Sequence, residues 1–463
     1  MDNRKRGYMK ALSVVILAAG KGTRMKSTLP KPLHEIGGKP MLSHVLSTAR
    51  ELDPAQLIVI YGHEGEKLKA AYEDASDITW VEQKTFLGTG DAMKYAMPAI
   101  LPDSNVLVLY ADTPLIDVKT LQSMLEKVDE KNLCWLTVEA DQPFGYGRII
   151  RNDAGNMVAI VEEKDANSTQ KAITEVNSGL FAVSSDVLSV TLPRLSDDNQ
   201  QKEFYLTDVV TLALEDGLTI QTAAGDFTLL RGVNDRVQLS ELEAIYQNQQ
   251  RKALMLAGVT MIAPETVFIQ GEIKLKGLDI VIEPNVTLAG VVSLGNNVRI
   301  GQGSHITNAK LCDDVEVHPY SMIESSLLYN NVAVGPYARL RTNSVLKEHS
   351  KVGNFVETKN VTLGEGSKAN HLTYLGDATI GKGVNIGAGT ITCNYDGAYK
   401  HQTIIEDDAF IGSNSSLVAP VEIKKGATIG AGSTITSSIS EGALAITRAT
   451  LRQIQNWKRP TKK

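Results

Sequence analysis

The sequence has 463 residues, of which 43% are hydrophobic and 22% charged. It is therefore long enough for about two to four domains and apolar enough to fold. Its 47 Lys and Arg residues against 53 Asp and Glu residues give a net charge of −6, which argues against a dedicated nucleic-acid-binding protein. The cysteines Cys134, Cys312 and Cys393 contain no Cys-x-x-Cys pair, so we expect no disulfide scaffold and a reducing cytoplasm.

The first 20 residues fit two different structures. A basic stretch at 1–10 and an apolar stretch at 11–20 have the layout of a secretory signal. Residues 12–19 are equally typical of a buried parallel strand, which we favour because the glycine-rich segment after them makes better sense as a ligand loop. Met9 is a candidate for the natural start. No run of 18 apolar residues occurs in the sequence, so we expect no membrane span.

Residues 12 to about 235 alternate short apolar runs with helical stretches. Continuous apolar runs at 57–61 and 106–110 have the length of strands, and the spacing at 42–52 and 118–128 is helical. Strands that are apolar throughout are typical of a parallel sheet covered by helices on both faces. We therefore expect a Rossmann-like α/β domain with a mostly parallel sheet.

A single helix is expected between the two halves of the chain. Its apolar residues share one helix face, and Gly258 would end it. These apolar residues are Val237, Leu239, Leu242, Ile245 and Tyr246. We therefore divide the chain into an N-terminal domain over 1–234, a linker helix over 235–257 and a C-terminal domain over 258–463.

From about residue 265 onward, aliphatic residues recur every six positions. This period fits neither a helix nor one long alternating strand, but it is typical of a parallel β-helix whose short strands each send one aliphatic side chain inward. Three walls make a coil of about 18 residues, so we expect roughly ten coils. A chance run of Val, Ile and Gly in a sandwich is the disfavoured alternative. The inward positions are Ile282, Leu288, Leu294, Ile300, Ile306, Leu311, Val317, Ile323, Leu328, Val334, Leu340, Ile380, Ile386, Thr392, Ile411, Leu417, Ile423, Ile429 and Ile435.

Two stretches depart from this period. Residues 341–374 keep only a weak phase, and residues 393–403 contain no aliphatic residue in register. We expect the second stretch to be a loop thrown out from the coil, where solenoids often carry a binding site. The basic tail over 447–463 is expected to form a short helix around 451–457 that caps the solenoid.

The first strand runs into a glycine-rich segment, Leu17–Arg24. A glycine turn after a parallel strand lets backbone N–H groups approach phosphates, and Arg24 and Lys31 add positive charge. Met25 stands where a dinucleotide fingerprint needs its third glycine, and no Walker A motif is present. We favour a phosphate loop over an ordinary strand-to-helix turn.

Asp112 follows the apolar run at 106–110. The carboxyl ends of parallel strands form the ligand crevice, and an acid beside phosphates there would hold Mg²⁺. A helix N-cap explains the spacing of Asp112 equally well.

Several motifs together resemble one family of enzymes. Those of the first half resemble the sugar-nucleotidyltransferase signature. With the solenoid motifs added, the chain resembles, over about residues 10–460, the bacterial bifunctional N-acetylglucosamine-1-phosphate uridyltransferase / glucosamine-1-phosphate acetyltransferase family. The motifs are LAAGKGTRM at 17–25, LPK at 29–31, LGTG at 87–90, YADTP at 110–114, FGYGRI at 144–149, VEEKDA at 161–166, VNSGL at 176–180, YLTD at 205–208, GVND at 232–235, NHLTYLGD at 370–377 and NIGAGTITCNYDG at 385–397.

The resemblance implies a nucleotide-binding α/β domain followed by a left-handed parallel β-helix of hexapeptide repeats. It implies acetyl transfer from acetyl-CoA to glucosamine-1-phosphate, then Mg²⁺-dependent uridylyl transfer from UTP to N-acetylglucosamine-1-phosphate. The UDP-N-acetylglucosamine formed would feed peptidoglycan and lipopolysaccharide synthesis. The resemblance also implies a cytoplasmic homotrimer that acts on small molecules, with no nucleic-acid or membrane partner and with acetyl-transfer sites at subunit junctions.

For the uridyltransferase site, the resemblance implies three groups of residues. Those for the nucleotide are Leu17, Ala18, Ala19, Gly20, Lys31, Gln83, Gly88, Thr89, Tyr110 and Asp112. Those for the sugar phosphate are Gly147, Glu162, Asn177, Thr207 and Asn234. Asp112 and Asn234 would hold the metal.

For the acetyltransferase site, the resemblance makes His371 the general base, a role that suits the ordinary pKa of histidine. Asn370 stands beside it where the family usually has Gly. Those implied for the sugar phosphate are Arg341, Lys359, Tyr374, Asn385 and Lys400. Those implied for acetyl-CoA are Ala388, Asn394, Tyr395, Ser413, Ala431 and Arg448.

Two other functions remain open from the sequence. One is a related pyrophosphorylase that uses glucose-1-phosphate and has a regulatory solenoid, which His371 and the loop after it argue against. The other is a non-enzymatic scaffold with a decayed nucleotide domain, which the intact Lys31, Asp112 and Asn234 disfavour. Assays of coenzyme A release and of UTP-dependent pyrophosphate release distinguish these functions.

Overall fold

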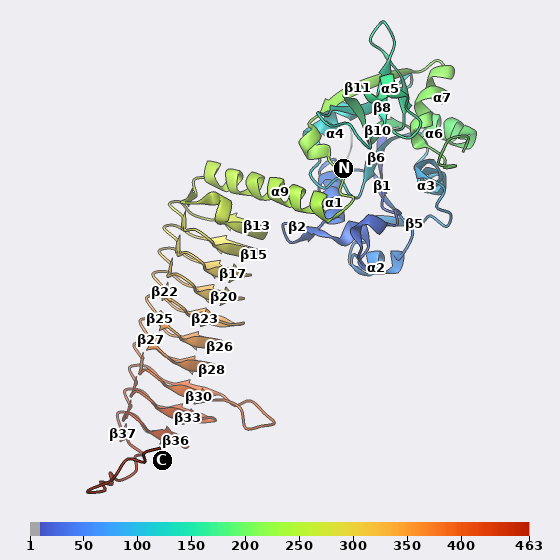
Figure 1. Cartoon of the computed structure of the whole chain (residues 1–463). Coiled ribbons are helices and arrows are strands. Elements are labelled where there is room, and N and C mark those ends of the chain that lie inside the picture. Colours follow the sequence, from blue (N-terminus) through green and yellow to red (C-terminus); the bar gives the residue numbers. More distant parts are fainter. Residues whose placement is uncertain (1–9, 463) are drawn as a thin grey trace. The chain divides into compact units, whose positions relative to one another are not determined.

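The computed structural model of the chain describes residues 10–462. These divide between Tyr246 and Gln247, inside one long helix, into two compact units (Figure 1). Each unit has its own hydrophobic core, so each is described by itself.

The N-terminal unit contains a nine-stranded sheet with the order β11-β7-β10-β6-β1-β4-β5, from which β8 and β9 branch at β10 (Figure 1). Only β10 runs antiparallel to its neighbours β6 and β7 along that order, so the predicted mostly parallel sheet is confirmed. The strands are β1 (Ala11–Leu17), β4 (Gln56–Tyr61), β5 (Ile78–Glu82), β6 (Ser104–Tyr110), β7 (Asn132–Glu139), β8 (Arg148–Arg151), β9 (Met157–Val161), β10 (Glu175–Ser184) and β11 (Thr219–Gly225), with the separate pair β2 (Glu35–Ile36) and β3 (Lys39–Pro40).

Helices cover both faces of this sheet because its inner strands are apolar on both sides. In β1, Val14 and Ile16 enter the core on one face, under α1 and α4, while Val15 and Leu17 enter the core on the other, under α3, α6 and α7. The apolar residues after the basic N-terminal stretch are therefore a buried central strand, as predicted. The helices of this unit are α1 (Met41–Glu51), α2 (Gly65–Ala70), α3 (Thr89–Ala96), α4 (Val118–Leu125), α5 (Ser168–Lys171), α6 (Ser185–Thr191), α7 (Val209–Glu215) and α8 (Phe227–Leu230).

The connecting helix α9 spans Arg236–Leu256, and Gly258 follows it with a φ of 100°. Leu242 and Tyr246 are buried in the N-terminal unit. Val237, expected on the same apolar face, is 67% exposed, because the core contact of the helix begins only later along its length. The predicted three-part division of the chain stays a prediction.

The C-terminal unit is a parallel β-helix with three walls (Figure 1). The first wall is an 11-stranded sheet, and the second and third walls belong to one 15-stranded sheet, since some strands run round a corner. The first wall contains β12 (Thr260–Met261), β14 (Val281–Ile282), β16 (Arg299–Ile300), β19 (Glu316–Val317), β22 (Ala333–Val334), β25 (Lys351–Asn354), β27 (Lys368–His371), β29 (Asn385–Ile386), β32 (Phe410–Ile411), β35 (Thr428–Ile429) and β37 (Leu444–Ala445). The other sheet contains β13 (Phe268–Leu275), β15 (Thr287–Leu294), β17 (His305–Thr307), β18 (Lys310–Leu311), β20 (Met322–Glu324), β21 (Leu327–Leu328), β23 (Arg339–Leu340), β24 (Ser344–Leu346), β26 (Glu357–Leu363), β28 (Tyr374–Ile380), β30 (Ile391–Cys393), β31 (Thr403–Ile405), β33 (Ser416–Val418), β34 (Val421–Ile423) and β36 (Thr434–Ile435).

The pairing of successive coils confirms the predicted repeat. Arg299 pairs with Glu316, and Glu316 pairs with Ala333, so each of these coils takes 17 residues. Every aliphatic position assigned inward from the sequence, and Thr392 with them, is at most 3% exposed. The inward side chains therefore form one continuous apolar stack.

The stretch over 341–374 does not interrupt the coil, contrary to its weak phase in the sequence. Thr358 and Ala369 take inward positions there and are fully buried. The Thr358 hydroxyl is satisfied inside the stack by Ser344 at 2.8 Å. Leu346, Val352 and Leu363 continue the inward aliphatic series in this stretch, and the phase looks weak only where Thr358 and Ala369 replace an aliphatic residue.

The segment between β30 and β31 leaves the coil as a projecting loop, as predicted (Figure 1). Tyr395 and Lys400 pair across it in an antiparallel bridge. The expected helix over 451–457 is wrong, because this stretch has no helix. Leu451 and Trp457 are mostly exposed, and a helix this short has little stability without packing. Within residues 10–462, no helix is long and apolar enough to cross a membrane.

Candidate active sites

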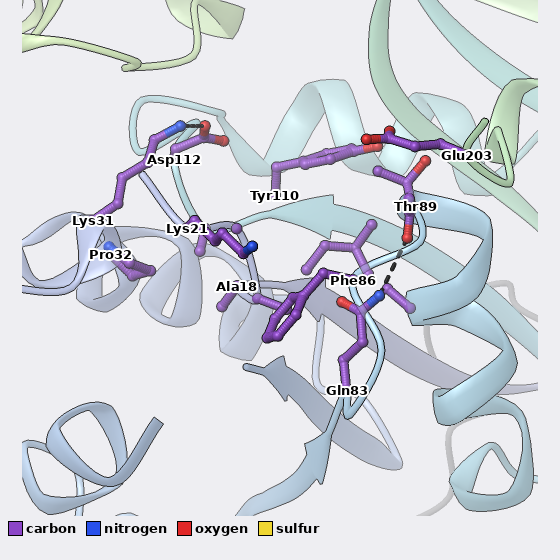
Figure 2. A pocket seen from close by; sticks show the side chains of 16 residues that line it. Ala18, Lys21, Lys31, Pro32, Gln83, Phe86, Thr89, Tyr110, Asp112 and Glu203 are labelled. Carbon is purple, nitrogen blue, oxygen red and sulfur yellow. Dashed lines mark hydrogen bonds and ion pairs between the residues drawn. The ribbon is translucent and has the colours of Figure 1, made fainter. Parts of the chain in front are cut away.

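A pocket of about 390 Å³ opens where β1 and β6 end (Figure 2). These strands are neighbours, and the chain continues from β1 to β4 on the opposite side of β1 from β6, which makes this the topological switch point where α/β sheets bind ligands. All ten residues assigned to the nucleotide line the pocket. The complete lining is Leu17, Ala18, Ala19, Gly20, Lys21, Lys31, Pro32, Gln83, Phe86, Gly88, Thr89, Ala92, Tyr110, Ala111, Asp112 and Glu203.

The glycine loop provides both room and backbone for this pocket. Gly22 has a φ of 57°, and a Cβ there would lie 2.8 Å from the Cβ of Lys31. Only glycine therefore lets Lys31 pass close beneath the loop and reach the pocket. Arg24, expected to help with phosphates, is exposed and does not line the pocket.

Lys31 lies between the two residues assigned to the metal. Its ammonium donates to Asp112 in a short contact and to Asn234 Oδ1 at 3.0 Å. A carboxylate oxygen and an amide oxygen thus converge on one cation, and these are the ligand types that Mg²⁺ takes when substrate phosphates supply the rest. The described residues contain no group of three or more acidic, His or Cys side chains at any metal-binding spacing, so Mg²⁺ would depend on the substrate for further ligands.

Six lining residues were not assigned from the sequence, among them Lys21, Phe86 and Glu203. Lys21 stands over the ring of Phe86, with 5.3 Å from its ammonium nitrogen to the ring centroid, and this pair faces the pocket (Figure 2). Lys21 lies inside the motif at 17–25 and Phe86 directly precedes the motif at 87–90, so the motifs could have pointed to both residues. Glu203 reaches the pocket from a distant segment, and no spacing in the sequence indicates that it does so.

Four of the five residues assigned to the sugar phosphate gather beyond Tyr110, and the fifth, Asn234, lies at Lys31 instead. The Thr207 hydroxyl donates to Glu162 at 3.2 Å, and a Cβ at Gly147 would lie 3.4 Å from the same carboxylate. Burial raises the pKa of Glu162 above its usual range. Burial, with Glu162 nearby, also raises the pKa of Tyr110 and keeps its phenol protonated.

Asn177 belongs to the same end of the site. Its Oδ1 accepts from the indole N–H of Trp135 at 2.6 Å and from the backbone N–H of Gly179 at 2.7 Å. Trp135 is fully buried and stacks on Phe181, with the rings 4.3 Å apart. Two donors on the oxygen leave the Asn177 amino group as the part available to a ligand. No motif in the sequence indicates that Trp135 holds this amide.

In the β-helix, His371 lies at the corner between the first and second walls. Its Nδ1 is 2.7 Å from Oδ1 of Asn354 in the preceding coil. Backbone bonds tie Ala388 to Asn414 and Ser413 to Gly432 at the same corner of the following coils. His371 and three acetyl-CoA residues, Ala388, Ser413 and Ala431, therefore form one column along this corner.

Positive charge gathers at the opposite edge of the second wall, where the projecting loop leaves. The ammonium of Lys400, carried by the loop, approaches Lys359 and holds the pKa of Lys359 below its usual range. Arg341 lies in the preceding coil and pairs with Glu357 at 2.8 Å. These three cations suit a phosphate group.

Other assigned residues of the β-helix lie apart or in the loop. Asn385 is on the first wall, paired with Lys368 and Phe410, whereas Tyr374 is on the second. Asn394 donates to Asp377 at the base of the loop, and Tyr395 is 61% exposed. Arg448, the last residue assigned to acetyl-CoA, lies near the corner that carries His371. Its Cδ would be 3.9 Å from a Cβ at Gly432.

Comparison with known proteins finds matches to both the α/β unit and the β-helix. The family described as the MobA-like NTP transferase domain matches residues 14–176, the GMPPB C-terminal domain matches 269–363, and the hexapeptide repeat of succinyl-transferase matches 402–437. The fold and these matches define a nucleotidyltransferase joined to a hexapeptide-repeat transferase, and they confirm the predicted fold. Bifunctional protein GlmU of Marinobacter nauticus is 50% identical over 456 residues, which cover 98% of this chain and all of that protein. The chain belongs to the GlmU family.

A solved structure offers a weaker likeness. It is a suggested glucose-1-phosphate thymidylyltransferase from Bacillus anthracis in complex with a sucrose, 18% identical, with a TM-score of 0.42 over 51% of this chain and 95% of that one. A likeness of this size carries no weight for the function.

Proposed function

We propose that this chain catalyses two successive steps of UDP-N-acetylglucosamine synthesis. The β-helix transfers acetyl from acetyl-CoA to glucosamine-1-phosphate, and the α/β unit transfers uridylyl from UTP to the N-acetylglucosamine-1-phosphate formed. Membership of the GlmU family supports both activities. The observation that carries the nucleotide half is a pocket at the switch point lined by all ten residues assigned to the nucleotide.

Uridylyl transfer needs alignment more than a reactive side chain. A phosphate oxygen of the sugar attacks the α-phosphorus of UTP, a new P–O bond forms, and the bond to the departing pyrophosphate breaks. Alignment of the two reactants supplies roughly 7–11 kcal/mol. The backbone at Ala18–Gly20 and the Lys31 ammonium bind the phosphates, while Glu162 and the Asn177 amino group orient the sugar.

The donor set at Asp112 and Asn234 fits Mg²⁺, because the two oxygens already converge on a cation in the form of the Lys31 ammonium. When bound there, Mg²⁺ supplies positive charge to the phosphate oxygens. Asp112, Asn234 and the substrate phosphates would hold it.

Acetyl transfer needs a base for the substrate amine. The amine nitrogen attacks the thioester carbonyl, a C–N bond forms, and the C–S bond breaks to release coenzyme A. His371 takes the proton that the amine loses, and Asn354 orients its ring through Nδ1. Arg341, Lys359 and Lys400 bind the sugar phosphate, and the corner column Ala388, Ser413 and Ala431 contacts the coenzyme.

The proposal extends to assembly and location. We propose a homotrimer that shares its acetyl-transfer sites between subunits, because the residues assigned to that site lie on different walls of one chain. UTP and acetyl-CoA as substrates support a cytoplasmic location, and so do the cysteines, which are all free.

Two single variants of the full chain test the division of labour. We expect His371→Ala to lose about 10²–10⁴-fold of acetyl transfer, the usual contribution of a placed base, and to keep uridylyl transfer. Asp112→Ala should lose uridylyl transfer and keep acetyl transfer. Coenzyme A release and UTP-dependent pyrophosphate release are measured on each preparation. Equal loss of both activities in either folded variant would contradict the assignment.

A further inference from the structure

One buried acid beside the nucleotide pocket has no role in the reactions above. Asp91 lies in the first turn of α3 and is 7% exposed. Its Oδ2 accepts from the Gln83 amide at 2.8 Å, from the Thr85 hydroxyl at 3.0 Å and from the Leu87 backbone N–H at 3.5 Å. Three donors on one oxygen at a helix N-terminus suit an ionised carboxylate, which can only accept.

This contact determines which end of the Gln83 amide faces the ligand. The Gln83 amino group has two hydrogens, and it donates one to Asp91 and the other to the Gly88 carbonyl at 3.3 Å. Figure 2 draws the bond to the Gly88 carbonyl as a dashed line from the Gln83 nitrogen, with the Gln83 oxygen on the other side of the amide. The opposite orientation would place the Gln83 oxygen against two acceptors, so the amide cannot turn over.

We propose that Asp91 is the positioning residue for base selection, because it makes Gln83 a pure hydrogen-bond acceptor toward the nucleobase. This inference rests on the proposed function, in which Gln83 reads the base of UTP. A fixed acceptor pairs with the N3–H of uracil. Cytosine has an unprotonated N3 that only accepts, so the same acceptor leaves two lone pairs opposed and neither group satisfied.

The neighbours of Asp91 make the consequence of its removal specific. Without the carboxylate, the Leu87 N–H loses its side-chain acceptor, and the Thr85 hydroxyl keeps only Tyr95 as a partner. Both can then donate to the Gln83 oxygen, and these bonds offset the one acceptor that remains opposite it, the Gly88 carbonyl. The amide can therefore turn over and present its amino group to the base. In that orientation the Gln83 amino group donates to N3 of cytosine, whereas it meets the N3–H of uracil as a second donor.

The test compares kcat/KM for UTP and for CTP with N-acetylglucosamine-1-phosphate as the acceptor. We expect the UTP-to-CTP ratio to fall at least about tenfold in Asp91→Ala, the size of effect that one unpaired polar group produces. Asp91→Asn is the matched variant, since its amide oxygen can take the place of Oδ2, and it should keep the ratio within about threefold of the wild type. A lower activity with an unchanged ratio in Asp91→Ala would make Asp91 merely structural and overturn the inference.

Binding to the unmodified protein gives a second, independent measurement. Calorimetry of UTP, CTP and N3-methyl-UTP should show both analogues at least about tenfold weaker than UTP, because neither offers an N3–H to Gln83. Equal affinities would overturn the inference even if the alanine variant failed to fold. Absence of any UTP turnover in the wild-type chain would instead overturn the proposed function as well.

Discussion

Glu162 shows how burial of one side chain sets the chemistry of the sugar end. Its pKa is raised by burial and pulled back only in part by the Thr207 hydroxyl. The carboxyl therefore gains a proton at a higher pH than an exposed glutamate does. In the proposed role, the ionised group would accept hydrogen bonds from sugar hydroxyls, whereas the protonated acid would offer a single donor in their place.

Uridylyl transfer should therefore weaken on the acidic side through this residue. We expect kcat/KM for the sugar phosphate to fall as the pH drops through the raised pKa of Glu162. Glu162→Gln should lower kcat/KM roughly tenfold to a hundredfold at pH 7, since a bond to a charged group is lost, and should remove that limb of the profile. Steady-state assays across pH 4–8 measure it. If Glu162→Gln keeps the fall in kcat/KM at acidic pH, the titration of another group causes that fall.

The same shift has a consequence for stability. Because the folded-state pKa lies above the unfolded one, the folded protein binds the proton more tightly, and stability falls as the pH rises through this range. Glu162→Gln should thus unfold at a slightly higher temperature than the wild type at pH 7, and the difference should vanish at low pH.

Among the elements, the loop between β30 and β31 is organised by one acid. Asp396 accepts from the backbone N–H groups of Ala398 and Tyr399 and from the His401 ring at 2.7 Å. The backbone N–H of Tyr399 and the His401 ring hold the pKa of Asp396 well below its usual range. The loop thus keeps one conformation and carries Lys400 to the edge of the second wall.

Loss of that acid should loosen the loop without touching the coil. We expect Asp396→Ala to raise KM for glucosamine-1-phosphate about tenfold, since Lys400 loses its position, and to leave uridylyl transfer unchanged. The loop should also be cleaved faster by trypsin in the native state. Glu365→Ala, which breaks an exposed pair with Lys382 elsewhere on the coil, is the control and should change neither. Unaltered kinetics in Asp396→Ala would remove the loop from the site.

For the whole molecule, the walls of the β-helix decide whether one chain can build an acetyl-transfer site. His371 ends a strand of the first wall at its corner with the second wall, and Asn385 lies within the first wall, while Lys359 is at the far edge of the second wall. Side chains on different faces of a rigid prism do not converge on one small substrate. A neighbouring copy related by threefold symmetry would bring one edge against the other.

Mixed assemblies test this arrangement. We expect His371→Ala and Lys359→Ala to be inactive in acetyl transfer when each is expressed alone. Co-expressed in equal amounts, they should regain roughly a quarter of the wild-type activity, because random assortment pairs an intact edge of one chain with an intact edge of its neighbour. Mass measurement in solution confirms that the mixture is trimeric. A trimeric mixture that stays inactive would place the whole site on one chain.

The period of six, the apolar strands and the glycine loop could all be predicted from the sequence, because each is a local pattern that survives wherever the chain goes. The ten residues assigned to the nucleotide came from the family resemblance that the short motifs carry, and all ten line the pocket. Only the tertiary structure decided that Glu203 reaches this pocket, that Trp135 holds Asn177 and that Asp91 orients Gln83. It also decided that His371 lies at the corner of the first and second walls, whereas Lys359 lies at the far edge of the second wall. These contacts join side chains through packing and hydrogen-bond geometry, and no spacing along the chain encodes the direction in which an amide or a ring points.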